Sequence, residues 1–200
     1  MKPIIIAICG KSATGKDTLL KQIAKSRIGA TVIVSDTTRP PRDGEVDGQD
    51  YNFKKTFEFV SGIRRGKYLE WTTFRDWFYG TPEDSVCGKI NVGVFNPAGM
   101  KSLSKFQDDY EIIPVYLVTS LWTRIKRYVS REGKWSWELP RRLLADFKDF
   151  FGFRKHILSL FPQFHIMPSN GEDDLLFAVE LLETDIKTKE LHHQMSWVDL

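Results

Sequence analysis

The chain has 200 residues, of which 42% are hydrophobic and 13% aromatic, enough to bury the core of one domain with small insertions. Its 29 basic and 26 acidic residues are mixed along the sequence, so the net charge of +3 is not gathered into the dense basic block that nucleic-acid binding favours. No stretch approaches the roughly 20 apolar residues of a membrane-spanning helix, and the composition favours small anionic ligands.

Apolar runs and helical patterns alternate along the chain. The runs that predict buried strands are residues 4–9, 31–34, 90–95, 112–118 and 164–167. The patterns that predict helices are residues 16–27, 97–106, 120–131, 139–160 and 172–189. This alternation indicates an α/β fold, with a parallel sheet covered by helices on both faces.

The first apolar run and the two cysteines bear on cellular location. Because the run from Pro3 to Cys9 leads directly into Gly10, it predicts a buried strand rather than a signal peptide. Cys9 and Cys87 form neither a metal-type pair nor a disulfide framework, which indicates a reducing compartment. We therefore expect a cytoplasmic monomer or homodimer that binds neither membranes nor nucleic acid.

Two segments interrupt the alternation of strands and helices. Residues 36–81 are rich in Pro, Gly, Asp and aromatic residues, and residues 131–141 are charged and contain two tryptophans. Each predicts an insertion that closes over a site. The core then consists of residues 1–35, 82–130 and 142–200.

The segment GKSATGKDT, from Gly10 to Thr18, fits the pattern Gly-x4-Gly-Lys between a strand and a helix, the context of a P-loop. Glycines allow backbone N–H groups to turn inward around phosphate oxygens, and Lys16 can reach the β and γ phosphates. An ordinary glycine-rich turn is the alternative. The residues expected to bind ATP here are Gly10, Ser12, Ala13, Thr14, Gly15, Lys16, Asp17 and Thr18.

Asp17 stands where such loops usually carry a Mg²⁺-binding Ser or Thr, and Thr18 follows one position late. A carboxylate beside polyphosphate repels it unless a cation lies between them. We therefore expect Asp17 to help hold Mg²⁺, directly or through water. The alternative is an acid that only complements the positive end of the following helix.

Residues 35–53, SDTTRPPRDGEVDGQDYNF, place two arginines three positions apart beside two prolines, with a tyrosine beyond a glycine-bearing turn. This segment resembles the nucleotide-monophosphate segment of guanylate kinases. The resemblance continues through residues 68–71 (YLEW) and 78–81 (FYGT), then through the helical pattern at 120–131 and the basic segment behind it. It covers most of the chain in the same order.

The resemblance implies that Arg39, Arg42, Tyr51 and Tyr79 hold the phosphate of the acceptor. A guanidinium group can donate two parallel hydrogen bonds to two oxygens of a phosphate, and each phenol can donate one further hydrogen bond. The alternatives are surface charge for the arginines and core packing for the tyrosines.

Glu70, Ser35 and Thr81 match the positions that contact guanine in that family. A carboxylate accepts hydrogen bonds from guanine N1–H and the 2-amino group, while hydroxyl groups reach O6 or N7. Adenine offers no donor at N1, so an unpaired carboxylate would discriminate against AMP. A solvated acid on a strand is the alternative for Glu70.

The lid of the family matches Arg131 and either Arg142 or Arg141, which would close onto the phosphoryl group in transfer. Arg127 lies four residues before Arg131 on the same helical face and would contact ATP. Asn170 falls where the family contacts the adenine end of ATP. Alternatives are a basic helix end for the arginines and a turn residue for Asn170.

The sequence departs from guanylate kinases at the end of the third core strand. That family carries acidic residues there, whereas residues 91–97 (NVGVFNP) contain no carboxylate. Because those acids help to organise Mg²⁺ and the acceptor, we expect Asp17 to take over their part from the phosphate loop.

The resemblance implies a P-loop nucleoside monophosphate kinase with a parallel-sheet core, an acceptor domain at 36–81 and a lid at 131–141. With ATP and Mg²⁺ it would convert GMP or dGMP to the diphosphate. Ribose 1,5-bisphosphate kinases, which share the Gly-Lys-Asp loop and the Asn at the strand end, are the runner-up. A non-catalytic guanylate-kinase-like module that holds an acidic or phosphorylated peptide is a further alternative, although it has no use for Lys16.

Overall fold

The computed structural model describes residues 2–42, 44–74, 76–132, 138–161 and 163–195. Within these residues five parallel strands form the main sheet, in the spatial order β2-β7-β1-β8-β9. The strands are β1 (Ile4–Gly10), β2 (Thr31–Val32), β7 (Ile90–Val94), β8 (Glu111–Val118) and β9 (His165–Pro168). The central strand β1 is buried along its whole length, which explains its unbroken apolar sequence.

Helices cover both faces of the main sheet. On one face α1 (Lys16–Lys25) and α7 (Glu172–Met195) pack against one set of alternate β1 residues. On the other face α3 (Pro97–Leu103) and α6 (Phe153–Leu160) pack against the remaining set. The two sets are Ile4, Ile6 and Ile8, and Ile5, Ala7 and Cys9.

A second, smaller sheet is built by residues 36–82, in the spatial order β4-β3-β6-β5. Its strands are β3 (Asp36–Thr37), β4 (Asn52–Phe53), β5 (Tyr68–Phe74) and β6 (Trp77–Pro82). Helix α2 (Thr56–Arg64) covers this sheet through Phe59, whose ring lies 4.5 Å from that of Tyr68 and 5.3 Å from that of Phe78.

Asp36 ties the strands of the small sheet together from a fully buried position. Its carboxylate accepts hydrogen bonds from Asn52 Nδ2 (2.9 Å), the Tyr68 hydroxyl (2.9 Å) and Lys67 Nζ (3.1 Å). A buried carboxylate requires such partners, because an unpaired charge in the interior is costly. The small sheet therefore has a polar centre as well as an aromatic one.

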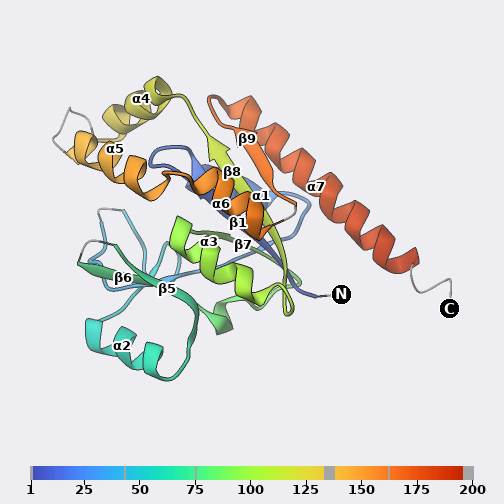
Figure 1. Ribbon diagram of the computed structural model, residues 1–200, viewed down its shortest axis with the longest axis horizontal. Helices are drawn as coiled ribbons and strands as arrows, with labels where there is room; N and C mark the ends of the chain where they lie inside the picture. The colour runs from blue at the N-terminus through green and yellow to red at the C-terminus, as the bar shows by residue number, and fades with distance from the viewer. Residues whose placement is uncertain (1, 43, 75, 133–137, 162, 196–200) are drawn as a thin grey trace.

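The remaining helices lie beyond the carboxyl ends of the parallel strands. Figure 1 shows α4 (Leu121–Glu132) and α5 (Glu138–Asp149) above and the small sheet with α2 below, toward this same end of the main sheet. Ligands of open α/β sheets bind outside the carboxyl ends of the strands. This arrangement therefore places both groups of elements beside the expected site.

The structure confirms an α/β fold with a parallel main sheet, but several elements differ in length from their expected ranges. The strand expected at 31–34 is ladder-paired only at Thr31–Val32, because the chain then leaves toward β3. The helix expected at 97–106 ends as α3 at Leu103 and continues as a 3₁₀ turn, Ser104–Phe106. A further 3₁₀ turn, Glu83–Ser85, follows β6.

The prediction of one helix over 139–160 is wrong, since α5 and α6 are separated at residues 150–152. Gly152 there has a left-handed backbone, with φ 66°. Glycine adopts this conformation without strain and is also a poor helix former. The break allows α6 to lie on the main sheet while α5 crosses toward the phosphate loop.

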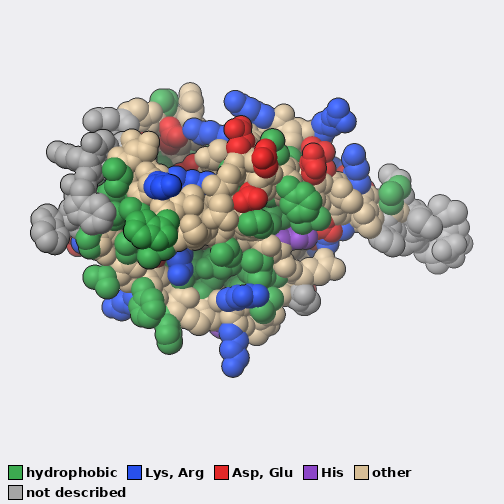
Figure 2. Space-filling model, turned by 90° about the horizontal axis from the view of Figure 1, so that it is seen from above, with side chains coloured by type: hydrophobic (Ala, Val, Ile, Leu, Met, Phe, Trp, Pro, Cys, Tyr) green, Lys and Arg blue, Asp and Glu red, His purple; other side chains and the backbone are tan. Residues whose placement is uncertain are grey.

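The surface carries both apolar and charged side chains. Figure 2 shows hydrophobic side chains gathered in patches on the face viewed from above, with Lys and Arg spread among them. Trp122 and Phe151 are among the exposed residues, at 75% and 79%. No described helix, α7 included, is both long and apolar enough to cross a membrane.

We predict that Gly152→Ala lowers the free energy of unfolding by about 1–2 kcal/mol, the cost of a left-handed backbone for an L-residue. No atom lies within 4 Å of the added Cβ, so backbone strain rather than a clash is responsible. Denaturant unfolding measures the loss. Gly152→Asn is the control and should lose less, because asparagine tolerates this conformation; equal losses would contradict the explanation.

Candidate active site

The phosphate loop connects the end of β1 at Gly10 to the start of α1 at Lys16. Gly15 and Ala13 have left-handed backbones, with φ values of 90° and 60°. For Ala13 this conformation costs roughly 1–3 kcal/mol, which the surrounding contacts must offset. Non-glycine residues in such conformations are concentrated at ligand sites, so the loop has the strain expected of a site built for binding.

Hydrogen bonds within the chain hold the loop in its curved shape. Thr14 Oγ1 donates to the Lys11 carbonyl oxygen (2.9 Å), and Ser169 Oγ, just after β9, donates to the Thr14 carbonyl oxygen (2.6 Å). Lys16 Nζ donates to the carbonyl oxygens of Gly10 and Lys11, both at 2.9 Å. Loss of hydration lowers the pKa of Lys16, so its ammonium would gain from an anionic ligand.

Two residues that the sequence did not single out, Arg124 of α4 and Asp146 of α5, also bind the loop. Ser12 N–H donates to both carboxylate oxygens of Asp146 (3.1 Å each), and Ser12 Oγ donates to Oδ1 (2.9 Å). Arg124 Nε donates to the Ser12 carbonyl oxygen (2.8 Å), and its Nη2 is paired with Asp146. Both side chains are buried, at 7% and 9% exposure.

Glu70 of β5 is buried and accepts a hydrogen bond from Thr81 Oγ1 of β6 (2.7 Å). The alternative of a solvated strand acid is therefore wrong. Burial raises the pKa of Glu70 to about 7, and the Thr81 hydrogen bonds only partly oppose this effect. The start of α3 comes so close that a Cβ at Gly99 would lie 2.9 Å from Glu70 Oε2.

Arg39 packs against aromatic side chains of the segment between β3 and β6. Arg39 is buried, donates to Glu45 Oε1 (2.8 Å) and lies over the Tyr51 ring, 5.5 Å from its centroid. The Tyr51 and Tyr79 rings are 6.1 Å apart in an edge arrangement. Burial raises the pKa of Tyr51 to about 12, so its phenol is protonated at neutral pH and can donate a hydrogen bond.

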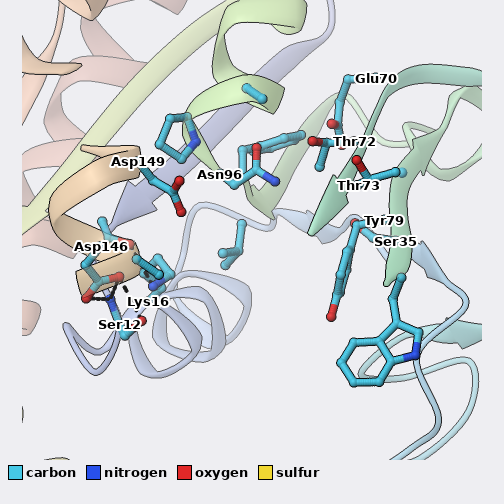
Figure 3. A pocket seen from close by; sticks show the side chains of 18 of the residues that line it. Ser12, Lys16, Ser35, Glu70, Thr72, Thr73, Tyr79, Asn96, Asp146 and Asp149 are labelled. Carbon is cyan, nitrogen blue, oxygen red and sulfur yellow. Dashed lines mark hydrogen bonds between the residues drawn. The ribbon is translucent and has the colours of Figure 1, made fainter. Parts of the chain in front are cut away.

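One cavity of about 480 Å³ joins the phosphate loop to the small sheet. Figure 3 shows Lys16, Ser12, Asp146 and Asp149 on one side, Glu70 and Tyr79 on the other, and Asn96 between the two sides. Of the residues expected from the sequence, the cavity is lined by Gly10, Ser12, Lys16, Ser35, Arg42, Tyr51, Glu70 and Tyr79. Lining residues that the sequence did not indicate include Thr72, Thr73, Trp77, Asp146 and Asp149.

The residues expected on the lid side are only partly described. Arg127 Nη1 lies 3.4 Å from the Ala13 carbonyl oxygen, above the loop, and Arg141 is exposed near the start of α5. Arg131 and Arg142 fall in α4 and α5, but their side chains lie outside the described part of the chain. Residues 133–137 of the expected lid lie outside it as well.

Asn170 lies between β9 and α7, where it organises local structure. Its side-chain oxygen accepts from Ser120 N–H (3.0 Å), and its own N–H donates to Asp174 Oδ2 (2.7 Å). These contacts fit the turn role that the sequence left open for Asn170. It is exposed, so a contact with a nucleotide base stays a prediction.

Asp17 is exposed at the start of α1 and lines a surface hollow with Thr18 and Lys21 rather than the main cavity. Its charge still acts across the site, since it is one of the causes that raise the pKa of Tyr51, after burial. Among the described residues no three His, Cys, Asp or Glu side chains form a group that could hold a metal. Asp17 therefore fits a cation only if phosphate oxygens and water supply most of the ligands, as Mg²⁺ allows.

Comparison with known sequences finds guanylate kinases. The family model described as guanylate kinase matches residues 1–134. The guanylate kinase of Gloeobacter violaceus is 43% identical over 89 residues, 44% of this chain and 43% of that protein. For that of Psychrobacter arcticus the identity is 32% over 146 residues, 70% of this chain and 69% of the relative. The chain spans about half the length of several curated relatives it matches.

Solved structures share the fold at low identity. A crystal structure of guanylate kinase from Anaplasma phagocytophilum matches with a TM-score of 0.63 and 16% identity, over 94% of this chain and 87% of that one. A gluconokinase from Sinorhizobium meliloti matches with a TM-score of 0.50 and 13% identity, over 94% and 97%. At such identities the similarity concerns the fold alone.

We predict that Glu70→Gln raises the free energy of unfolding at pH 8, by up to about 3 kcal/mol, in the absence of nucleotide. The pKa of Glu70 is about 7 in the folded chain and 4.5 in the unfolded chain. Between these two pH values the unfolded chain binds fewer protons than the folded chain, so the free energy of unfolding falls as the pH rises from 4.5 to 7. The advantage of the variant should therefore grow from pH 4.5 to 7, be constant above, and vanish below.

The control for this prediction is Glu45→Gln. Although burial opposes it, hydrogen bonds from Arg39 and Arg42 lower the pKa of Glu45. This variant should be less stable than the parent at neutral pH, and its deficit should disappear as pH falls through the folded pKa. Denaturant unfolding at several pH values measures both variants, and the same pH trend in the two would contradict the assignment for Glu70.

Proposed function

We propose that this chain, which belongs to the guanylate kinase family, transfers the γ-phosphoryl group of ATP to the phosphate of GMP or dGMP. Residues 36–81 then form the acceptor domain and residues 131–141 the lid. The observation that carries the proposal is the cavity of about 480 Å³, which joins a phosphate loop bearing Lys16 to a pocket bearing a buried acid, Glu70. A donor and an acceptor can meet in such a space, because transfer needs the reacting groups held in line and in contact.

Glu70 supports a guanine-containing acceptor. Guanine presents N1–H and the 2-amino group side by side, and an ionised Glu70 can accept one hydrogen bond on each oxygen, while Oε1 also accepts from Thr81. Because burial raises the pKa of Glu70 to about 7, a ligand that offers two donors favours the charged form and draws a proton off the free protein. Adenine offers no donor at N1, so AMP would leave this buried carboxylate without a partner.

The acceptor phosphate has cationic and phenolic partners close at hand. Arg42, Tyr51 and Tyr79 line the cavity, and the Arg39 guanidinium lies over the Tyr51 ring. The Tyr51 phenol is protonated, so it donates to an anionic oxygen rather than repelling it. Ser35 lines the same wall and can hydrogen-bond the base.

The donor phosphates would lie in the loop from Gly10 to Thr18, where Lys16 exchanges its carbonyl partners for phosphate oxygens. Arg127 is already above the loop at Ala13. Together with Arg131 and Arg141 or Arg142, it would neutralise charge on the group in transfer while the lid excludes water. Positioning and charge neutralisation therefore account for catalysis without a covalent intermediate.

A bound Mg²⁺ would supply positive charge that offsets the repulsion between donor and acceptor phosphates. Asp17 is the residue we assign to it, directly or through water, in place of the acids absent from the end of β7. Val94 and Asn96 line the cavity at that strand end, so a carboxylate restored there would face the cavity.

We predict that ADP release with ATP and Mg²⁺ is fastest with GMP or dGMP, in a coupled assay across all nucleoside monophosphates and ribose 1,5-bisphosphate. Glu70→Gln should reduce kcat/KM for GMP by about 10- to 100-fold, since hydrogen bonds to a charged group contribute about 1.5–3 kcal/mol. Its effect on the slow reaction with AMP should be small. Lys16→Met should abolish turnover with every acceptor.

Other outcomes of this assay separate the alternatives. Fastest release with ribose 1,5-bisphosphate would replace the nucleotide by a sugar bisphosphate as acceptor. Silence with every acceptor, while ATP still binds, would leave a guanylate-kinase-like module that does not catalyse transfer.

We predict that Asp17→Ala raises the Mg²⁺ concentration needed for half-maximal turnover at fixed ATP, and that adding Val94→Asp to it restores the lower value. The reason is that both positions offer a carboxylate oxygen near the donor phosphates. Val94→Asn in the Asp17→Ala background is the uncharged control. Failure of Val94→Asp to restore more than Val94→Asn would show that Asp17 and the strand end do not serve one cation.

A further inference from the structure

The phosphate loop already holds an anion that belongs to the chain itself. The carboxylate of Asp146 accepts the backbone N–H of Ser12 with both oxygens (3.1 Å each) and the Ser12 hydroxyl with Oδ1 (2.9 Å). Backbone N–H groups of such loops are the ones that bind phosphate oxygens in a nucleotide. Asp146 thus takes up a hydrogen-bond donor that a phosphate could use, and Figure 3 shows it bonded to Ser12 near Lys16.

Arg124 contacts both Ser12 and Asp146. Its Nε donates to the Ser12 carbonyl oxygen (2.8 Å), which fixes the guanidinium beside the loop, and its Nη2 is paired with Asp146. The pair is nearly excluded from water, with Arg124 at 7% and Asp146 at 9% exposure. A guanidinium so placed matches a phosphate as well as it matches a carboxylate.

A fixed carboxylate at this point conflicts with the binding of a polyphosphate. Like charges within a few ångströms in a poorly hydrated site repel strongly, and Ser12 N–H cannot serve two acceptors fully. Either the donor leaves Ser12 unused, or Asp146 leaves the loop when the donor binds. Arg124 favours the second outcome, because its Nε contact with Ser12 can remain while Nη2 changes partner.

We propose that Asp146 is an internal substitute for a nucleotide phosphate, and that Arg124 is a nucleotide-binding residue which Asp146 holds in place until ATP arrives. Donor oxygens replace the carboxylate on Ser12 and then pair with Arg124. This proposal rests on the proposed function only in taking the loop to bind ATP phosphates.

The test is the affinity for ATP in the absence of any acceptor, measured by isothermal titration calorimetry at one salt concentration. Asp146→Asn should bind ATP about tenfold more tightly than the parent chain, because the competing charge is gone. Arg124→Gln should bind about tenfold more weakly, because a partner of the phosphate is lost. The two variants of one ion pair therefore shift the affinity in opposite directions.

Asp149→Asn is the matched control, since it removes one negative charge one turn further along α5, from the wall of the same cavity. A gain for Asp146→Asn no larger than that for Asp149→Asn would reduce the effect to general electrostatics and overturn the proposal. Weaker ATP binding by both Asp146→Asn and Arg124→Gln would also overturn it. An ion pair that stays intact when ATP binds predicts that replacing either partner lowers the affinity for ATP.

Asp146→Asn leaves the buried Arg124 guanidinium without its ionic partner, so the folding of this variant is checked by circular dichroism. A second comparison, in which Arg124 is also replaced, removes that unpaired charge. Arg124→Gln combined with Asp146→Asn should bind ATP more tightly than Arg124→Gln alone; equal or weaker binding contradicts the proposal. The proposed function is judged separately, by turnover with GMP. If the chain phosphorylates GMP but Asp146→Asn gains no more ATP affinity than Asp149→Asn, only this inference fails. If Asp146→Asn gains more affinity than Asp149→Asn but GMP is not phosphorylated, only the proposed function fails.

Discussion

The curvature of the phosphate loop is the constraint on which the site depends. The loop leaves the fully buried centre of the main sheet at Gly10 and must turn within a few residues into α1, which places Ala13 in a left-handed conformation. Contacts from distant parts of the chain offset that strain, among them Ser169 after β9 and Arg124 on α4. Because the loop is held from several sides, the elements that hold it also become the walls of the site.

A second constraint is the burial of Glu70 in the small sheet. An acid whose pKa is raised to about 7 costs folding free energy at neutral pH, and the free protein gains nothing from this position beyond the Thr81 hydrogen bond. A ligand with two adjacent N–H donors would recover that cost on binding. The buried acid thus lowers the free energy of unfolding, but it favours ligands that supply hydrogen-bond donors over ligands that do not. Binding sites commonly reduce folding stability in this way.

Acidic side chains on the two sides of the cavity have different kinds of partner. In and beside the small sheet two acids have charged or hydrogen-bonding partners within the chain: Asp36 bonds three side chains, and Glu45 bonds Arg39. On the loop side, Asp146 and Arg124 share Ser12, a residue whose N–H group a phosphate would also use. Pairs within the chain therefore help to shape the pocket beside the small sheet, whereas the pair on the loop is the one that we propose a ligand rearranges.

The sequence by itself determined the features that are local in the chain. The Gly-x4-Gly-Lys spacing, the strand before it and the helix after it depend only on neighbouring residues, and they predicted both the loop and the α/β alternation. The segment at 35–81 likewise contained Glu70 and the aromatic and arginine residues around it within one stretch. Boundaries were less well predicted, because the break at Gly152 serves the different directions of α5 and α6.

Only the tertiary structure decided which distant residues meet. Arg124, Asp146 and Ser12 are separated by more than a hundred positions at the extremes, and nothing in the periodicity of α4 or α5 shows that they share one hydrogen-bond network. Burial, too, is a property of the folded chain, so the raised pKa of Glu70 could not be read from its neighbours in sequence. Contacts of this kind arise from packing between elements, which a linear pattern does not contain.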